Sequence, residues 1–173
     1  MIISVEQAKE LVDLNGWTDK KIQMKLDAIE SVIRAYTHNN FQNRSLRAEC
    51  SVIAPKLYGS VPGLKVGDTV EINDSCFSDG LYVVEAIEEK MITVDKQLLD
   101  ESHALVTKVE YPADVVNFLV ELLEWSVNYG GKVGVKSETL SRHSVTYEDS
   151  ATLFMGYPIG ILNGLKLHMK ARF

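Results

Sequence analysis

Residues 112–130, PADVVNFLVELLEWSVNYG, form the stretch on which the rest of the chain depends. Proline opens the stretch and Gly130-Gly131 closes it, which predicts a helix with a defined start and stop. Its polar residues recur at intervals of three and four and therefore share one stripe roughly 80° wide. The stripe comprises Asp114, Asn117, Glu121, Glu124 and Asn128. The remaining circumference is apolar, which predicts either a central core helix or a helix partly covered by another subunit.

Two helices are expected before this stretch. A capping box of Ser4 and Gln7 predicts a short helix to about Leu14, with a buried edge of Ala8, Leu11 and Val12. Thr18 caps a longer helix, which the polar run at residues 37–44 ends. Its narrow apolar seam comprises Ile22, Leu26, Ile29, Ile33 and Tyr36. An antiparallel helical pair that packs on the helix at residues 112–130 follows from this pattern.

Residues 45–110 show a different pattern, with short runs of strand character separated by turn signals. Five such runs predict a small five-stranded barrel of the SH3-like or a similar kind. The inward-facing candidates alternate along the runs and comprise Val70, Ile72, Tyr82, Val84 and Ile92. Helices are expected on both sides, so the barrel is expected to interrupt a helical domain made of residues 1–44 and 111–173. The predicted fold class is α+β, a small bundle of about four helices with this inserted barrel.

Residues 132–150 alternate loosely and have β-propensity, but they hold too few apolar residues for a core of their own. Two interpretations stay open, a surface hairpin and an extended arm that adds a strand to the barrel, a neighbouring subunit or a partner. A closing helix is expected at residues 158–173. Gly160 and Gly164 would weaken that helix or allow a close approach of its backbone.

The net charge is −6 and the sequence pI is about 5.2, which argues against a dedicated nucleic-acid-binding surface. Cys50 and Cys76 lack metal-ligand spacing, and we expect free, semi-buried thiols in a reducing compartment. Neither a signal peptide nor a membrane-spanning run is recognised, so we expect a soluble protein made inside a cell.

The sequence offers no convincing catalytic or cofactor-binding pattern. None of the four histidines has a partner at metal-ligand spacing. Arg142 and His143 are the only candidates for an unrecognised active site, and His143 and its serine neighbours would point to opposite faces of a strand. We therefore expect a non-enzymatic protein with no catalytic residues, cofactor or metal.

The order of elements resembles a known family. A capped helix with Ser4 is followed by a helix capped at Thr18, an apolar helix led by Pro112, the runs at residues 134–138 and 144–147, and a closing Tyr157-Pro158 helix. Over residues 2–40 and 110–173 this order resembles the head–tail connector (adaptor, head-completion) proteins of long-tailed bacteriophages and prophages. The barrel departs from the shortest members, which join the second and third helices by a simple loop.

The resemblance implies a structural virion protein at the head–tail junction, made in the cytoplasm of a bacterial host. Such proteins form a ring, typically of twelve copies, under the portal protein, where they extend the DNA channel and dock stopper or tail-completion proteins. DNA would pass without sequence-specific binding, and no membrane is involved. The expected partner and subunit interface comprises Trp125, Val135, Ser137, Leu140, Val145, Tyr147 and Phe173.

One alternative class stays open, a non-enzymatic binding module that uses the barrel to recognise a peptide or nucleic acid. Between residues 44 and 110 the chain has seven Lys or Arg and twelve Asp or Glu, which gives 7 − 12 = −5. This sign is unfavourable for contact with phosphates.

Overall fold

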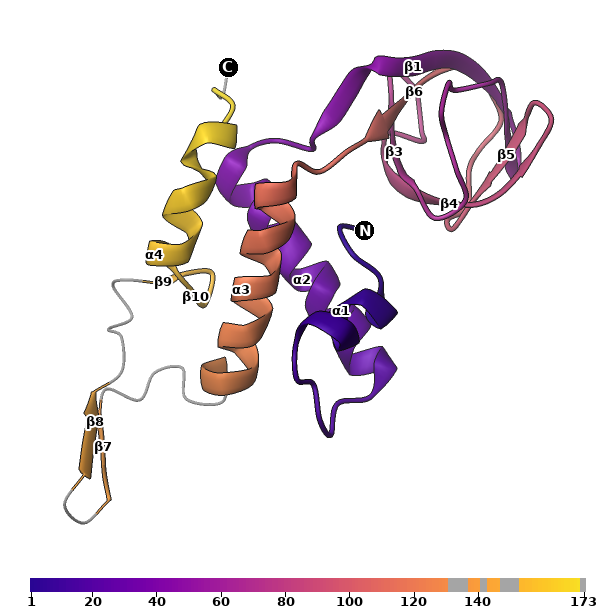
Figure 1. The fold of residues 1–173 in the computed structure, drawn as a ribbon. Helices are drawn as coiled ribbons and strands as arrows, with labels where there is room; N and C mark the ends of the chain where they lie inside the picture. Colours follow the sequence, from indigo (N-terminus) through magenta and orange to yellow (C-terminus); the bar gives the residue numbers. More distant parts are fainter. Residues whose placement is uncertain (131–136, 141–142, 147–152, 172–173) are drawn as a thin grey trace. The chain divides into compact units, whose positions relative to one another are not determined.

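The computed structural model describes residues 1–130, 137–140, 143–146 and 153–171 (Figure 1). The chain forms two compact units. One unit comprises Asn40–Tyr111 together with Met1, and the other comprises Ile2–Asn39 and Pro112–Phe173. The first contains a closed β-barrel and the second contains the helices, so the protein is of mixed α and β class.

The helical unit is built around α3 (Ala113–Tyr129), which contacts α2 (Asp19–Thr37), α4 (Ile159–Leu162) and the 3-10 helix η3 (Asn163–His168). In Figure 1, α3 lies between α2 on one side and α4 with η3 on the other. The fully buried side chains of α3 share one face; they are Val115, Leu119, Leu122 and Leu123. On α2 they meet a seam in which Ile22, Leu26, Ile29 and Ile33 are buried as predicted, whereas Tyr36 is half-buried.

A smaller part of the circumference of α3 is buried than its apolar composition predicts. Val116, Val120 and Val127 on one flank and Phe118 and Trp125 on the other are half-buried. The predicted polar stripe faces solvent at Asp114, Asn117, Glu124 and Asn128, with Glu121 half-buried. Within the described residues, α3 therefore has a buried face, two half-buried apolar flanks and one polar stripe that is mostly exposed to solvent.

The predicted helix starts are confirmed. The Ser4 hydroxyl accepts a hydrogen bond from the Gln7 amide, and the Gln7 side chain accepts one from the Ser4 amide, at the start of α1 (Val5–Leu11). Thr18 Oγ1 accepts from the Lys21 amide at the start of α2. The expected end of α1 at Leu14 is wrong, because the chain becomes extended at Val12 and carries that side chain and Leu14 into the core.

Leu11 is exposed, so its predicted place on the buried edge of α1 is also wrong. It is the last residue of α1, and the chain turns away before another helical turn can bring it toward the core.

The predicted helix at residues 158–173 is much shorter in the structure. Only α4 is α-helical, η3 follows it, and the backbone is extended at Met169. Two contacts with the end of α2 replace further helical bonds: the Lys170 amide donates to Thr37 O at 2.8 Å, and Asn39 Nδ2 donates to His168 O at 3.1 Å. The close approach expected at the glycines occurs at Gly164, which lies directly against the Phe118 ring.

The barrel has six antiparallel strands in the order β1-β2-β5-β4-β3-β6, closed by pairing of β6 with β1. Its strands are β1 (Gln42–Ile53), β2 (Lys56–Tyr58), β3 (Thr69–Asn73), β4 (Gly80–Glu88), β5 (Met91–Val94) and β6 (Glu101–Val109). The predicted number of five is therefore wrong. The missed strand, β2, is only three residues long, too short for a period-2 pattern to reveal it.

The predicted inward-facing residues of the barrel are confirmed. Val70, Ile72, Tyr82, Val84 and Ile92 all belong to one buried cluster. The first and last strands lie side by side, since Gln42 of β1 pairs with Val109 of β6 and the Glu110 amide donates to Phe41 O at 2.9 Å. Both ends of the inserted segment therefore leave the barrel at the same place.

Two short two-stranded sheets belong to the helical unit. Within residues 132–150, β7 (Ser137–Leu140) pairs antiparallel with β8 (His143–Thr146), with Ser137 opposite Thr146. Farther on, β9 (Leu153–Phe154) pairs with β10 (Tyr157–Pro158). The hairpin form of the segment is thus present, and the proposal that it adds to another chain stays a prediction.

Candidate interaction surfaces

The part of the chain that the structure describes holds no group of three or more His, Cys, Asp or Glu side chains arranged to bind a metal ion. No helix within the same residues is both long and apolar enough to cross a bilayer. The surface features that stand out are a basic pocket on α2 and an exposed aromatic loop on the barrel.

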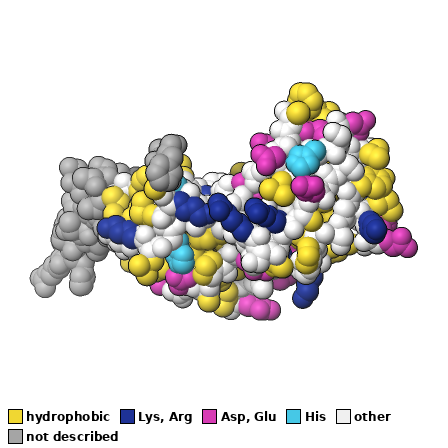
Figure 2. Space-filling view, turned by 90° about the horizontal axis from the view of Figure 1, so that it is seen from above, with side chains coloured by type: hydrophobic (Ala, Val, Ile, Leu, Met, Phe, Trp, Pro, Cys, Tyr) yellow, Lys and Arg dark blue, Asp and Glu magenta, His cyan; other side chains and the backbone are white. Residues whose placement is uncertain are grey.

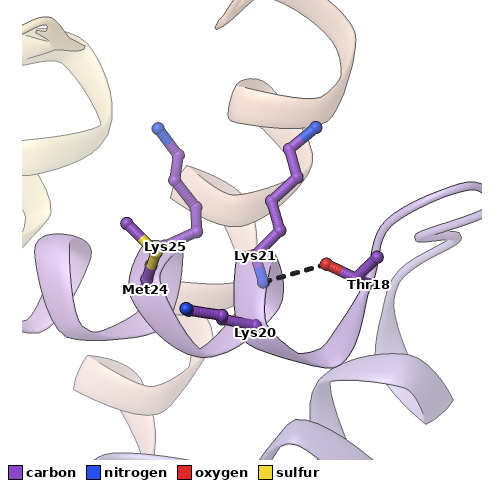
Figure 3. A pocket seen from close by; sticks show the side chains of 5 residues that line it. All are labelled: Thr18, Lys20, Lys21, Met24 and Lys25. Atoms are coloured by element: carbon purple, nitrogen blue, oxygen red, sulfur yellow. Dashed lines mark hydrogen bonds between the residues drawn. The ribbon is translucent and has the colours of Figure 1, made fainter.

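The basic pocket, called here the lysine pocket, lies at the N-terminal end of α2. It is a shallow hollow of about 470 Å³ lined by Thr18, Lys20, Lys21, Met24 and Lys25. Figure 3 shows these side chains leaving one side of α2, with Lys21 and Lys25 pointing the same way from successive turns. Met24 is 66% exposed, so an apolar side chain lies in the open among three ammonium groups.

Aromatic rings make cation–π contacts with two of the lysines. Lys21 Nζ lies 4.0 Å from the centre of the Trp17 ring, and Lys25 Nζ lies 4.9 Å from the centre of the Tyr157 ring. A cation over an aromatic face gains about 0.5–1 kcal/mol at an exposed site. These contacts therefore favour one position for each of the two side chains that line the pocket.

The aromatic loop, called here the Phe77 loop, comprises residues 74–79 between β3 and β4. Phe77 at its tip is 72% exposed. A single exposed apolar side chain is common on protein surfaces, and Phe77 is of interest because hydrogen bonds hold the backbone of its loop in place.

Two carboxylates hold the Phe77 loop in one conformation. Asp79 Oδ1 accepts hydrogen bonds from the amide and the hydroxyl of Ser75, at 3.0 and 2.7 Å. The Glu101 carboxylate, at the start of β6, accepts from the Cys76 amide and from the Ser78 hydroxyl. The hydrogen bond from the Ser78 hydroxyl is the main cause that lowers the pKa of Glu101, and that from the Ser75 hydroxyl lowers the pKa of Asp79. Both groups are therefore charged at neutral pH.

The base of the loop is anchored in the barrel. Ser78 is 2% exposed, and its carbonyl oxygen accepts a hydrogen bond from the buried Tyr82 hydroxyl at 2.9 Å. The Phe77 side chain is thus presented by a rigid support, which lowers the entropy that any partner must overcome on binding.

Acidic side chains predominate around this loop, although one cation, Lys96, lies near its base, with Nζ 2.6 Å from Leu81 O and 5.4 Å from the centre of the Tyr82 ring. Asp74 and Asp79 lie within the loop, Asp100 and Glu101 lie at the start of the strand that supports it, and residues 73–82 and 97–104 contain no Lys or Arg. On the face seen in Figure 2, acidic and hydrophobic side chains lie next to one another on the barrel, at the right of the view. A partner for this surface would need an apolar hollow ringed by cations.

The predicted interface residues fall on different parts of the structure. Trp125 is half-buried on α3, with its ring 5.9 Å from that of Tyr157 and 6.3 Å from that of Tyr129. Ser137 and Leu140 lie in β7 and Val145 lies in β8. Val135, Tyr147 and Phe173 lie outside the described residues. Of the candidates for an active site, Arg142 is also outside, and His143 pairs with Leu140 in the hairpin.

The two cysteines differ, although the sequence suggested the same semi-buried state for both. Cys50 is buried in the barrel, and burial raises the pKa of its thiol to about 11. Cys76 is exposed and lies in the Phe77 loop. The turn residues around it, Ser75, Ser78 and Asp79, are the local signal for this loop.

Sequence reasoning missed both the lysine pocket and the Phe77 loop. Lys20 and Lys21 lie opposite the apolar seam of their helix, which predicts only a solvated face, and no pattern singles out Lys25 or Phe77. A phenylalanine inside a turn-forming run is the signal that could have revealed the loop, because turns lie on the surface.

No protein-family model matches the chain, and no curated protein matches it either. What the two surfaces do is therefore argued from their residues and geometry.

Proposed function

We propose that this protein is a head–tail connector of a long-tailed bacteriophage or prophage, a structural protein with no enzymatic role. It would assemble as a ring under the portal protein, extend the DNA channel, and dock stopper or tail-completion proteins. The observation that carries the proposal is the order of elements in the helical unit: α1, α2, the apolar α3, the β7–β8 hairpin and the short closing helix α4. This order is the one on which the resemblance to the connector family rests.

Two physical features support the proposal. The half-covered flanks of α3, with Val116, Val120 and Val127 on one side, offer apolar area for packing against a neighbour. The net charge of −6 suits a channel wall that DNA must pass without sticking, since phosphates are repelled by carboxylates.

Within this proposal the helices form the small bundle that the sequence patterns predict, and the barrel is an SH3-like insert between the second and third helices. The insert would serve in contacts with proteins instead of DNA, because its charge is −5 over residues 44–110.

The test combines the purified chain with the portal protein of the phage or prophage that encodes it and examines the mixture by electron microscopy. The proposal expects an added ring at one end of the portal, with symmetry that matches it. A chain that stays monomeric and never binds the portal would refute the proposal. The free chain alone is the control, because a ring that requires the portal as a template will not form without it.

A second candidate is a binding module that acts through the barrel, and the exposed Phe77 favours it. The charge of the barrel favours a peptide over nucleic acid as its ligand. A DNA-binding titration at low and high salt separates the two ligands, and we expect no salt-dependent shift.

A further inference from the structure

We propose that the Phe77 loop of one copy binds in the lysine pocket of a neighbouring copy. The inference rests on the proposed function, in which copies of this chain lie side by side in a ring. It adds to that function a specific pair of surfaces, one on the barrel and one on α2.

Charge complementarity is the first argument. The lysine pocket presents Lys20, Lys21 and Lys25, while Asp74, Asp79, Asp100 and Glu101 accompany Phe77 on or beside its loop. Opposite electrostatic potentials steer the loop and the pocket together. Two loops, or two pockets, would repel one another because they carry charges of the same sign.

The apolar groups also match. Phe77 is 72% exposed, and Met24 is 66% exposed in the open, shallow hollow of the lysine pocket, so an aromatic ring could lie against it. A thioether against a ring is a favourable contact, and interaction hot spots are often aromatic anchors that become fully desolvated on binding.

Both surfaces are held ready before they meet. Hydrogen bonds to Asp79 and Glu101 hold the loop in one conformation, and the rings of Trp17 and Tyr157 favour one position for two of the lysines. Ordering the loop before binding reduces the conformational entropy that is lost on binding.

A contact between two different surfaces is heterologous. Each copy uses its loop toward one neighbour and its pocket toward the other, so the contact repeats until the rotation closes into a ring. This arrangement is the one that a ring beneath a portal requires.

Two variants remove one surface each. Lys20→Glu/Lys21→Glu reverses the charge of the pocket, and it keeps α2 stable because acidic residues are favoured in a first helical turn and Glu at position 21 forms a capping box with Thr18. Phe77→Ser removes the anchor. Each variant should weaken assembly on the portal about 30-fold or more, the effect of losing a hot spot. Lys65→Glu/Lys90→Glu makes the same change in net charge on exposed barrel residues and is the matched control.

Mixing the two defective variants gives a sharper test. One variant retains a working loop and the other a working pocket, so a mixture has one intact contact per pair. Analytical ultracentrifugation should then detect a one-to-one pair that neither variant forms alone. Docking of either surface on the portal only predicts no such pair.

A cross-link checks the geometry without disturbing the charges. Met24→Cys places a thiol in the pocket, and Cys76 is exposed next to Phe77. A short bismaleimide should join them between copies into ladders on a denaturing gel when the portal is present. Leu11→Cys is the control, because Leu11 is 54% exposed on the same unit but does not line the pocket.

The outcomes separate this inference from the function on which it rests. Wild-type rings together with defective variants, rescue in the mixture and cross-linked ladders support both. Wild-type rings with unaffected variants and no ladder overturn the inference and leave the connector function standing. Cross-linked chains that never bind a portal overturn the function and leave the contact between copies, and the absence of both rings and ladders overturns both.

Discussion

Replacement of Gly164 by alanine should destabilise the helical unit, whereas the same change at Gly160 should not. A Cβ atom added at Gly164 would lie 2.1 Å from Cζ and 2.4 Å from Cε1 of Phe118. Non-bonded carbons pack at about 3.5–4.0 Å, so the ring or the 3-10 helix must move by roughly 1.4 Å or more. Nothing lies within 4 Å of a Cβ added at Gly160.

The expected loss of stability in Gly164→Ala depends on which group can move to make room for the new methyl group. The Phe118 ring is half-buried and can turn partly into solvent, at the cost of its contact with η3. Overpacking of this kind costs about 1–3 kcal/mol. Neither glycine has a positive φ, so the alanine backbone itself is unstrained at both sites. At Gly160 alanine should be neutral or stabilise by about 0.4–1 kcal/mol, because it restricts the unfolded chain.

The assay is urea unfolding followed by tryptophan fluorescence. Trp17 and Trp125 both belong to the helical unit, so the signal reports on that unit and not on the barrel. We expect the unfolding midpoint to fall for Gly164→Ala and to stay or rise for Gly160→Ala.

A double variant identifies the cause. Phe118→Leu removes the Cζ atom that the new methyl group meets, so Gly164→Ala should cost less in that background, with a coupling energy above about 0.5 kcal/mol. Equal stability of the two alanine variants, or additive costs in the double variant, would refute the proposed packing of η3 on α3.

Three further predictions concern other parts of the chain. Gly59→Ala should destabilise the barrel by about 1–3 kcal/mol, because its Cβ would lie 2.4 Å from Cys50 Sγ; urea unfolding followed by labelling of the buried thiol measures this. Cys50, whose pKa burial raises to about 11, should resist iodoacetamide at pH 8 in the folded protein, while the exposed Cys76 reacts; mass spectrometry should find one adduct before unfolding and two after. Asp114→Asn should cost up to about 1 kcal/mol at neutral pH, since His168 Nε2 lies 2.6 Å from the Asp114 carboxylate and lowers its pKa. That stabilisation is present above the unfolded-state pKa of about 3.9 and is lost as pH falls through the folded-state pKa. The free energy of unfolding of the variant should therefore fall less steeply than that of the wild type as the pH is lowered through this range.

Local patterns in the sequence were enough for the features that depend on neighbours along the chain. The caps at Ser4 and Thr18 and the alternation through Val70 and Ile72 are set by residues within one turn or one strand, and the structure agrees with each. A cap is a contact over three residues, so no distant partner can change which side chain makes it.

Other features were missed because distant partners decide them. β2 is three residues long and exists by pairing with β1 and β5, and β1 begins at Gln42 in a stretch whose polar residues indicate a turn. The closing segment has helical spacing, yet contacts with Thr37 and Asn39 end it early.

By itself the sequence determined the starts of α1 and α2, the buried seam of α2 and the inward-facing residues of the barrel, and it predicted α3 as a long apolar helix. Only the tertiary structure decided that the barrel closes with six strands, that Gly164 lies on Phe118, and that Asp79 and Glu101 together hold Phe77 outward. The physical reason is the range of the interactions. Periodicity and capping act over a few residues, whereas strand closure, ring packing and a loop held by a carboxylate more than 20 residues away require the folded chain.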